Sequence, residues 1–264
     1  MSPNGKKVDA ILEEDLFEYY RTHSMLSDPG KYSHLYEDIP TSIPKMCAIA
    51  QNAIIHLFWA DSYGITLKDI EEKGRNPNKE LNKRMIEEKL DSLLSILDKP
   101  LTEKREPINR VVGNCRDYSL LLVSILRHKG IPARVRSGVA RYFFPPPTDF
   151  HEDHFVCEYW NATENHWQLV DPQIDSIQRQ SINSKVNPHD ISTDQFLDAG
   201  KAWLKLRTGK VKPRKIGVAG TEWYGEGYLR SKLIQDLACV NKIEVLAWEG
   251  WGLCRSKREL KNQE

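Results

Sequence analysis

The sequence lacks several features that mark whole classes of proteins. Its 264 residues include only five cysteines, at positions 47, 115, 157, 239 and 254, and none of them forms a CxxC pair. Paired cysteine motifs of the kind that hold zinc are therefore missing. Lys and Arg number 38 against 37 Asp and Glu, which leaves a formal net charge of +1. This balance gives neither a basic footprint for nucleic acid nor an acidic tail.

Long apolar runs are also missing. The longest, such as Leu120 to Val123, span only a few residues, whereas a membrane-spanning helix needs about 20. The first residues, MSPNGKKVDAILEEDL, contain no apolar segment of the kind that secretory signals carry. We therefore expect a cytoplasmic protein without membrane contact, whose cysteines are free thiols. No glycine-rich phosphate loop or dinucleotide fingerprint is present, so we expect no cofactor.

What is present is an ordinary globular composition, with 40% hydrophobic and 28% charged residues. We expect one domain over residues 1–264, with a helical N-terminal part (1–100), a core (101–175) and a C-terminal extension (176–264). Periodicity predicts helices at 8–22, 45–64, 79–97, 116–129, 193–207 and 228–240. Alternating β-branched and polar residues predict strands at 131–143, 154–160 and 166–171, the last two joined as a hairpin.

Cys115 occupies a chemically favourable place. It lies in the tripeptide GNC directly before an apolar helix, with Asn114 as candidate N-cap and Asp117 three residues later. A thiol in the first helical turn feels the positive end of the helix dipole, which favours the thiolate. The same turn has unpaired backbone N–H groups that suit an oxyanion. A lone cysteine would still more often be a buried core residue.

Two further residues make Cys115 more than a lone cysteine. His154 opens one strand of the expected hairpin, and Asp171 closes the other. Antiparallel neighbours place the head of one strand beside the tail of the next, so the two side chains should lie together. A thiol, an imidazole and an orienting carboxylate are the parts of an activated nucleophile.

These segments resemble the transglutaminase-like superfamily. The stretch GNCRDYSLLLVSILRHKGIPARVRSG (113–138) is similar to the nucleophile segment of that family, and HFVCEYW and WQLVDP are similar to its second and third segments. Glu158 falls four residues after His154, and Trp167 falls four residues before Asp171, as in the family pattern. The resemblance covers residues 113–172. Ser119 departs from it, since a small apolar residue is usual there.

The resemblance implies an α+β, papain-like fold in which the helix with Cys115 packs on an antiparallel sheet with His154 and Asp171. It implies attack of the Cys115 thiolate on an amide, ester or thioester carbonyl, with His154 as base and acid and Asp171 as orienter. A thioester acyl-enzyme then goes to an amine or to water. The implied substrates are peptides, amides or carrier-bound acyl groups. A cysteine peptidase or deamidase and a non-catalytic binding module remain alternatives, because a fold alone does not choose.

Other residues are weaker candidates. Arg110 or Arg116 could hold a carboxylate or phosphate if either faced the cleft, and Trp160 could line an acyl pocket, although a strand tryptophan is more often core. The second oxyanion donor is expected upstream, within 51–59 or at Asn109. His56 itself is expected to be a core histidine on a helix. The segment FFPPPTDFHED (143–153) could be a gating loop or only a longer connection. The motif HEDH (151–154) is a weak indication of a metal site. Trp223, Trp248 and Trp251 are expected to pack the C-terminal extension on the core, and less often to form a ligand wall.

Overall fold

The computed structural model describes residues 14–144 and 146–252. Residues 14–21 are helical, and the further α-helices are α2 (Ile43–Ala53), α3 (Leu67–Glu72), α4 (Pro77–Leu81), α5 (Ile86–Ile96), α6 (Cys115–His128), α7 (Ser176–Ser181), α8 (Ala199–Arg207) and α9 (Gly225–Val240). The strands are β1 (Ile54–His56), β2 (Val111–Gly113), β3 (Ala133–Phe144), β4 (Phe150–Asn161), β5 (His166–Val170), β6 (Phe196–Asp198) and β7 (Ile216–Gly217). Short 3-10 helices are η1 (Gly30–Tyr36), η2 (Ala60–Tyr63), η3 (Pro107–Asn109) and η4 (Pro213–Lys215). Within the described ranges, no helix combines the length and the apolar character that crossing a membrane requires.

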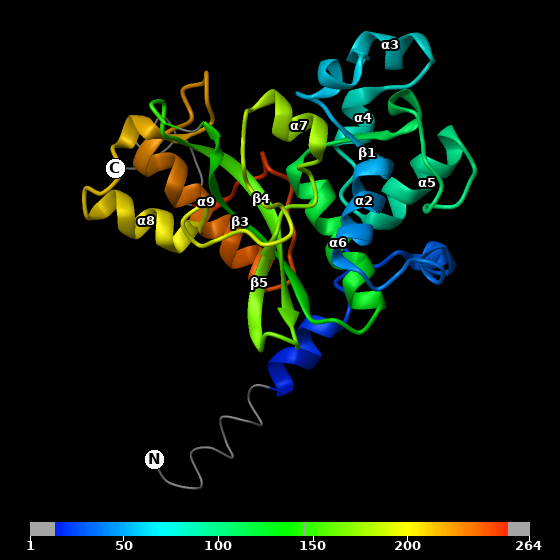
Figure 1. Ribbon diagram of the computed structural model, residues 1–264, viewed down its shortest axis with the longest axis horizontal. Coiled ribbons are helices and arrows are strands. Elements are labelled where there is room, and N and C mark those ends of the chain that lie inside the picture. The colour runs from blue at the N-terminus through cyan, green and yellow to red at the C-terminus, as the bar shows by residue number, and fades with distance from the viewer. Residues whose placement is uncertain (1–13, 145, 253–264) are drawn as a thin grey trace, which may run out of the picture.

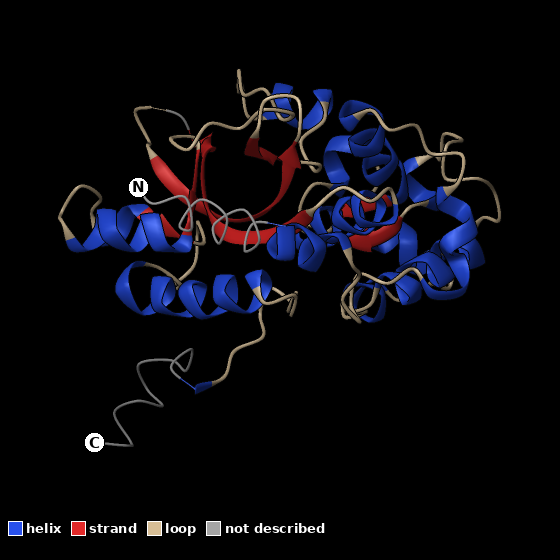
Figure 2. Ribbon diagram, turned by 90° about the horizontal axis from the view of Figure 1, so that it is seen from below, coloured by secondary structure: helices blue, strands red, loops and turns tan. Residues whose placement is uncertain are grey.

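The main sheet confirms the predicted α+β fold. Its strand order is β5-β4-β3-β6, with every neighbouring pair antiparallel, and β7 adds to β4 in parallel at Ile216. Figure 2 shows that this sheet is strongly curved, while α8 and α9 lie side by side at one end of the molecule (Figures 1 and 2). A separate two-stranded sheet pairs β1 with β2 in parallel.

Helix α6 is the centre of the molecule. Every residue from Cys115 to Arg127 is buried, because the helix packs against β3 and β4 as well as against α2 and α5. Its start is capped as predicted: Asn114 Oδ1 accepts the backbone N–H of Arg116 at 3.0 Å, and Asp117 Oδ2 accepts that of Asn114 at 3.0 Å. Gly130 ends the segment with a φ of 73°, a conformation that glycine adopts without strain.

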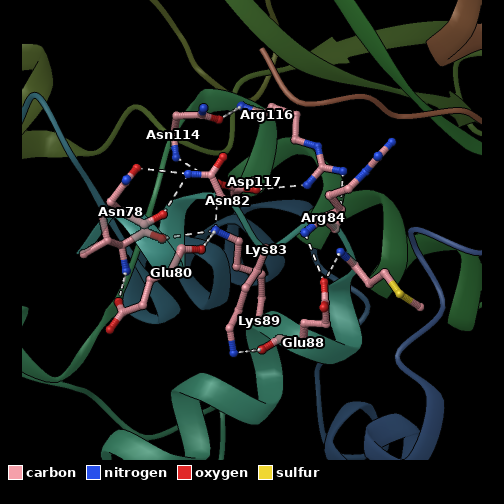
Figure 3. Close-up of polar contacts among 12 residues, drawn as sticks. Asn78, Glu80, Asn82, Lys83, Arg84, Glu88, Lys89, Asn114, Arg116 and Asp117 are labelled. Carbon is pink, nitrogen blue, oxygen red and sulfur yellow. Dashed lines mark hydrogen bonds and ion pairs between the residues drawn. The ribbon is translucent and has the colours of Figure 1, made fainter. Parts of the chain in front are cut away.

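A buried ionic network fixes the first turn of α6 (Figure 3). Asp117 Oδ2 lies 3.1 Å from Lys89 Nζ of α5, and Asp117 Oδ1 lies 3.0 Å from the Arg116 guanidinium. Lys89 also donates to the carbonyls of Glu80 and Val112. Burial lowers the pKa of Lys89, and the charge of Asp117 opposes that shift. Breaking such a pair leaves an uncompensated buried charge, so the network strongly restrains where Cys115 lies.

Three predicted helices have different bounds from those expected. The helix predicted at 45–64 ends at Ala53, and 54–56 form β1, which pairs with residues 111–113 far along the chain. The segment 79–97 is divided into α4 and α5. The helix predicted at 193–207 begins at Ala199 after a short strand. Of the helix predicted at 8–22, positions 8–13 lie outside the described residues.

Candidate active site

The structure brings Cys115, His154 and Asp171 together. Cys115 is the first residue of α6, His154 lies on β4, and Asp171 directly follows β5. His154 Nε2 is 2.8 Å from Asp171 Oδ2, and the interaction with the Cys115 side chain helps to raise the pKa of the same imidazole. The residues are 7%, 2% and 0% exposed, respectively. This is the order of contacts that an activated thiol requires: nucleophile, base, orienter.

The electrostatics of His154 favour its charged form. Burial alone lowers the pKa of the imidazole, but the charge and hydrogen bond of Asp171, together with the contact to Cys115, raise it to about 10. His154 is therefore an imidazolium near neutral pH, and an imidazolium beside a thiol favours the thiolate. Asp171 is itself held by two other donors: Tyr142 Oη at 2.6 Å from Oδ2 and the backbone N–H of Gln173 at 3.0 Å from Oδ1.

Ser119 connects the nucleophile helix to the histidine strand. Its hydroxyl oxygen lies 2.9 Å from the carbonyl oxygen of Cys115 and 3.1 Å from that of Phe155, the residue after His154. The hydroxyl can donate to one of these carbonyls at a time. The polar side chain at this position thus lies within hydrogen-bond distance of the backbone of Cys115 and of the residue that follows His154.

A cavity of about 490 Å³ opens at these residues. Cys115, His154 and Asn114 form part of its wall, and the rest comes from segments far apart in the chain. The lining is mostly apolar and includes Leu57, Phe58, Trp59, Leu81, Phe143, Phe144, Ile182, Val218, Ala247 and Trp248. Its size lies in the range of small-molecule sites, which is roughly 300–1,000 Å³. Cys115 therefore lines a largely apolar cavity.

His56 also lines this cavity, and it lies at the end of β1 rather than on a helix. Parallel pairing sets it opposite Gly113, two residues before Cys115. Its Nδ1 accepts the backbone N–H of Phe58 at 3.1 Å, so the ring proton is on Nε2. Burial, and to a lesser degree the charge of His154, lowers the pKa of His56 to about 3. His56 is thus a neutral N–H donor beside the nucleophile, within the predicted 51–59 segment, whereas Asn109 does not line this cavity.

Glu152 is the cavity residue that sequence reasoning missed. It lies two positions before His154 on β4, and its Oε2 accepts the backbone N–H of Ala219 at 3.0 Å. Burial raises the pKa of this carboxyl to about 7; the Ala219 hydrogen bond opposes the rise and the charge of Asp153 adds to it. Asp153 is itself held by Tyr228 and Lys232 of α9, each 2.6 Å away. The HEDH motif was the available signal. Among described residues, no group of three or more side chains suits a metal.

The other candidate binding residues lie elsewhere. The Arg116 guanidinium is fully buried and donates to the carbonyls of Glu244 and Arg84. Arg110 is buried over the ring of Tyr63, with its centre 5.3 Å from the ring centroid. Trp160 stacks with Phe17 and Trp167 at the far end of β4. None of the three lines the cavity, because each is drawn into packing with a distant segment. In the 143–153 stretch, Phe143 and Phe144 end β3, and residues 150–153 belong to β4.

The match to a family model agrees with this fold. The family model of the transglutaminase-like superfamily matches residues 84–172. No curated protein matches the chain. Among solved structures, the chain is similar to a "putative cysteine protease" from Cytophaga hutchinsonii, with 17% identity and a TM-score of 0.34 over 71% of this chain and 49% of that one. The chain thus spans about half the length of that protein. The matched residues, 84–172, contain Cys115, His154 and Asp171, so this part of the chain is similar to the transglutaminase-like superfamily.

Proposed function

We propose that the protein is a cysteine enzyme that attacks an amide or thioester carbonyl and forms a thioester acyl-enzyme on Cys115. One observation carries the proposal: His154 lies between Asp171 and Cys115, at the wall of a formed cavity. An acid–base group held on both sides, next to a thiol that faces a substrate-sized space, has the geometry of nucleophilic catalysis.

In the first step the thiolate sulfur of Cys115 bonds to the carbonyl carbon, and the carbonyl oxygen becomes an oxyanion. The bond from that carbon to the leaving nitrogen or sulfur then breaks, and the leaving group takes the proton from the His154 imidazolium. The backbone N–H of Cys115, at the first position of α6, has no partner within the helix and donates to the oxyanion. The Nε2–H of His56 is the second donor, because its neutral ring is fixed by Phe58 at the same wall.

The second step transfers the acyl group to an amine or to water. Glu152 supports the amine. A protonated primary amine gives its first proton to the Glu152 carboxylate, its nitrogen attacks the thioester carbon, and its second proton goes to His154 as the Cys115 thiolate leaves. Charge balances, since Glu152 becomes neutral and His154 becomes an imidazolium. The apolar lining supports the same outcome, because an acyl-enzyme shielded from water survives until an amine arrives.

The selectivity of thiol alkylation tests the nucleophile. Burial raises the pKa of the Cys47, Cys157 and Cys239 thiols, so they should stay protonated and react slowly. Iodoacetamide at neutral pH should therefore modify Cys115 at least about tenfold faster than these three, as read by mass-spectrometric mapping. Labelling of Cys115 as slow as that of Cys47, Cys157 and Cys239 would contradict an activated Cys115 and favour a binding module on this scaffold.

Replacement of Glu152 tests the acceptor. In Glu152→Gln, transfer to butylamine should fall by about a hundredfold, the usual contribution of a positioned base. Transfer to methoxyamine, which is already neutral near pH 7, should fall much less. In the wild type the butylamine rate should rise up to about pH 7, where Glu152 ionises beside Asp153 and His154, and then level off. In the variant the rate should keep rising above about pH 7, because it follows the fraction of unprotonated butylamine. Product formation from an acyl thioester gives the readout.

The exposed Glu164→Gln variant is the matched control and should behave as wild type, since Glu164 lies in the turn between β4 and β5. If Glu152→Gln slowed both amines equally, the carboxyl would act in positioning rather than in proton transfer. If water were the only acceptor consumed, the enzyme would be a peptidase or deamidase.

A further inference from the structure

Several aromatic side chains line the cavity, and none of them has a role in the proposed reaction steps. Five of them come from three segments that are distant in the chain: Phe58 and Trp59 after β1, Phe143 and Phe144 at the end of β3, and Trp248 near the C-terminal end of the described residues. Trp160, the residue that the sequence suggested for this role, is absent from the lining. For Trp248, the sequence favours a role in packing the C-terminal extension over a role in a ligand wall.

These rings are not there to build the core. Of the five, only Phe143 packs against one of the apolar cores that the described residues form. Phe58 is 80% exposed and Trp248 is 49% exposed. Large apolar side chains left in water around a concave surface contribute little to folding, and such patches typically mark binding sites.

The apolar wall begins at the reacting atoms. The ring of Phe143 stands edge-on to the His154 imidazole with centroids 4.9 Å apart, and the ring of Phe58 lies 5.8 Å from that of His56. The lining contains two carboxyl groups, those of Glu152 and Asp153, which are consecutive residues of β4. Among residues 14–144 and 146–252, no lysine or arginine is part of the lining.

From this arrangement we propose that the cavity is an acyl subsite for an uncharged apolar group, a medium-length alkyl or an aryl chain, attached to the carbonyl that Cys115 attacks. The inference rests on the proposed function, since it names the acyl group of the same intermediate. That group stays bonded to Cys115 until the acceptor arrives, so it needs a place of its own. An acyl chain ending in a carboxylate would lose hydration there without finding a lysine or arginine among the described lining residues.

Alkylation of Cys115 by N-alkyl iodoacetamides of increasing chain length tests the subsite without turnover. Rates at Cys115 are divided by the rates with glutathione, which removes intrinsic reactivity. We expect the normalised rate to rise with each added methylene, by up to about fourfold for a fully buried one, until the cavity is full. Phe58→Ala and Trp248→Ala should flatten the rise, because each removes part of the wall.

Trp251→Ala is the matched control. Trp251 is 44% exposed, close to the 49% of Trp248 in the same segment, but it does not line the cavity. Its series should match the wild type. A wild-type series that is flat, with Cys115 still labelled faster than the other thiols, would overturn the acyl subsite while leaving the nucleophile in place. Slow labelling of Cys115 with every reagent would instead count against the proposed function.

Acyl thioesters separate the acyl side from the leaving side. With one leaving thiol, kcat/KM should rise from acetyl to hexanoyl by about tenfold or more, and a terminal carboxylate on the chain should remove the gain. With a fixed acetyl group, lengthening the leaving thiol should change kcat/KM little. A rise only in the second series would overturn the proposal, because the aromatic wall would then hold the leaving group.

Discussion

Cys115→Ala should abolish turnover of any acyl substrate, with kcat lower by at least about 10⁴-fold. The variant removes the sulfur that bonds to the acyl carbon in the proposed mechanism, and no other described cysteine lines the cavity. The fold should persist, because the first turn of α6 is held by Asn114, Asp117 and Lys89 rather than by the thiol. We expect a thermal midpoint within about 5 °C of the wild type, measured by circular dichroism next to the turnover assay.

Cys47→Ala is the control for this experiment. Cys47 is fully buried in the core around α6, so its replacement removes a sulfur from packing and costs stability. It should nevertheless keep turnover. A Cys115→Ala protein that is folded and retains near wild-type turnover would contradict the thioester intermediate.

The elements that carry the three residues could be predicted because their signals are local. An apolar run with Asn114 before it and Gly130 after it forms α6 almost regardless of its surroundings. The hairpin of β4 and β5 is joined by a short turn, so its pairing needs no distant partner. These local signals predict the two strands that bring His154 and Asp171 together.

Other features of the structure depend on contacts between residues that are far apart in the sequence, and local sequence patterns could not predict them. The apolar run through 54–56 fits a helix as well as a strand, and the parallel pairing with 111–113 selects the strand. Arg116 follows the nucleophile directly, but one residue turns about 100° around a helix, and the guanidinium reaches the carbonyl of Glu244, 128 positions later. The C-terminal extension likewise adds Trp248 to the cavity. Tertiary contacts therefore build the cavity around Cys115, His154 and Asp171, whose own helix and strands have local sequence signals.

Asp171→Asn should slow acylation by about 10²- to 10⁴-fold without unfolding the protein. In the wild type, Oδ1 accepts the backbone N–H of Gln173, while Oδ2 accepts from both His154 and Tyr142. An amide has one oxygen, and the fixed backbone N–H of Gln173 retains it. The amide N–H then faces His154 Nε2, which must become an acceptor. The ring proton moves to Nδ1, so the imidazole can no longer take a proton there.

The pH dependence of Cys115 alkylation reports the same change. The charge of Asp171 holds the pKa of His154 up at about 10, against the effect of burial. Without that charge the pKa of His154 falls, the imidazole becomes neutral at lower pH, and it stops stabilising the thiolate. Alkylation by iodoacetamide near pH 7 should therefore slow down in Asp171→Asn, and the rise of the rate should move to higher pH.

Tyr142→Phe distinguishes the carboxylate from its surroundings. This variant removes one donor to Asp171 but keeps the charge and the His154 contact, so the rate should fall by about tenfold to a hundredfold, the value of one hydrogen bond to a charged group. A loss as large as that of Asp171→Asn would show that the hydroxyl holds the carboxylate in place. Unchanged alkylation curves and full turnover in Asp171→Asn would mean that Asp171 only ends its strand and that His154 is oriented by another group.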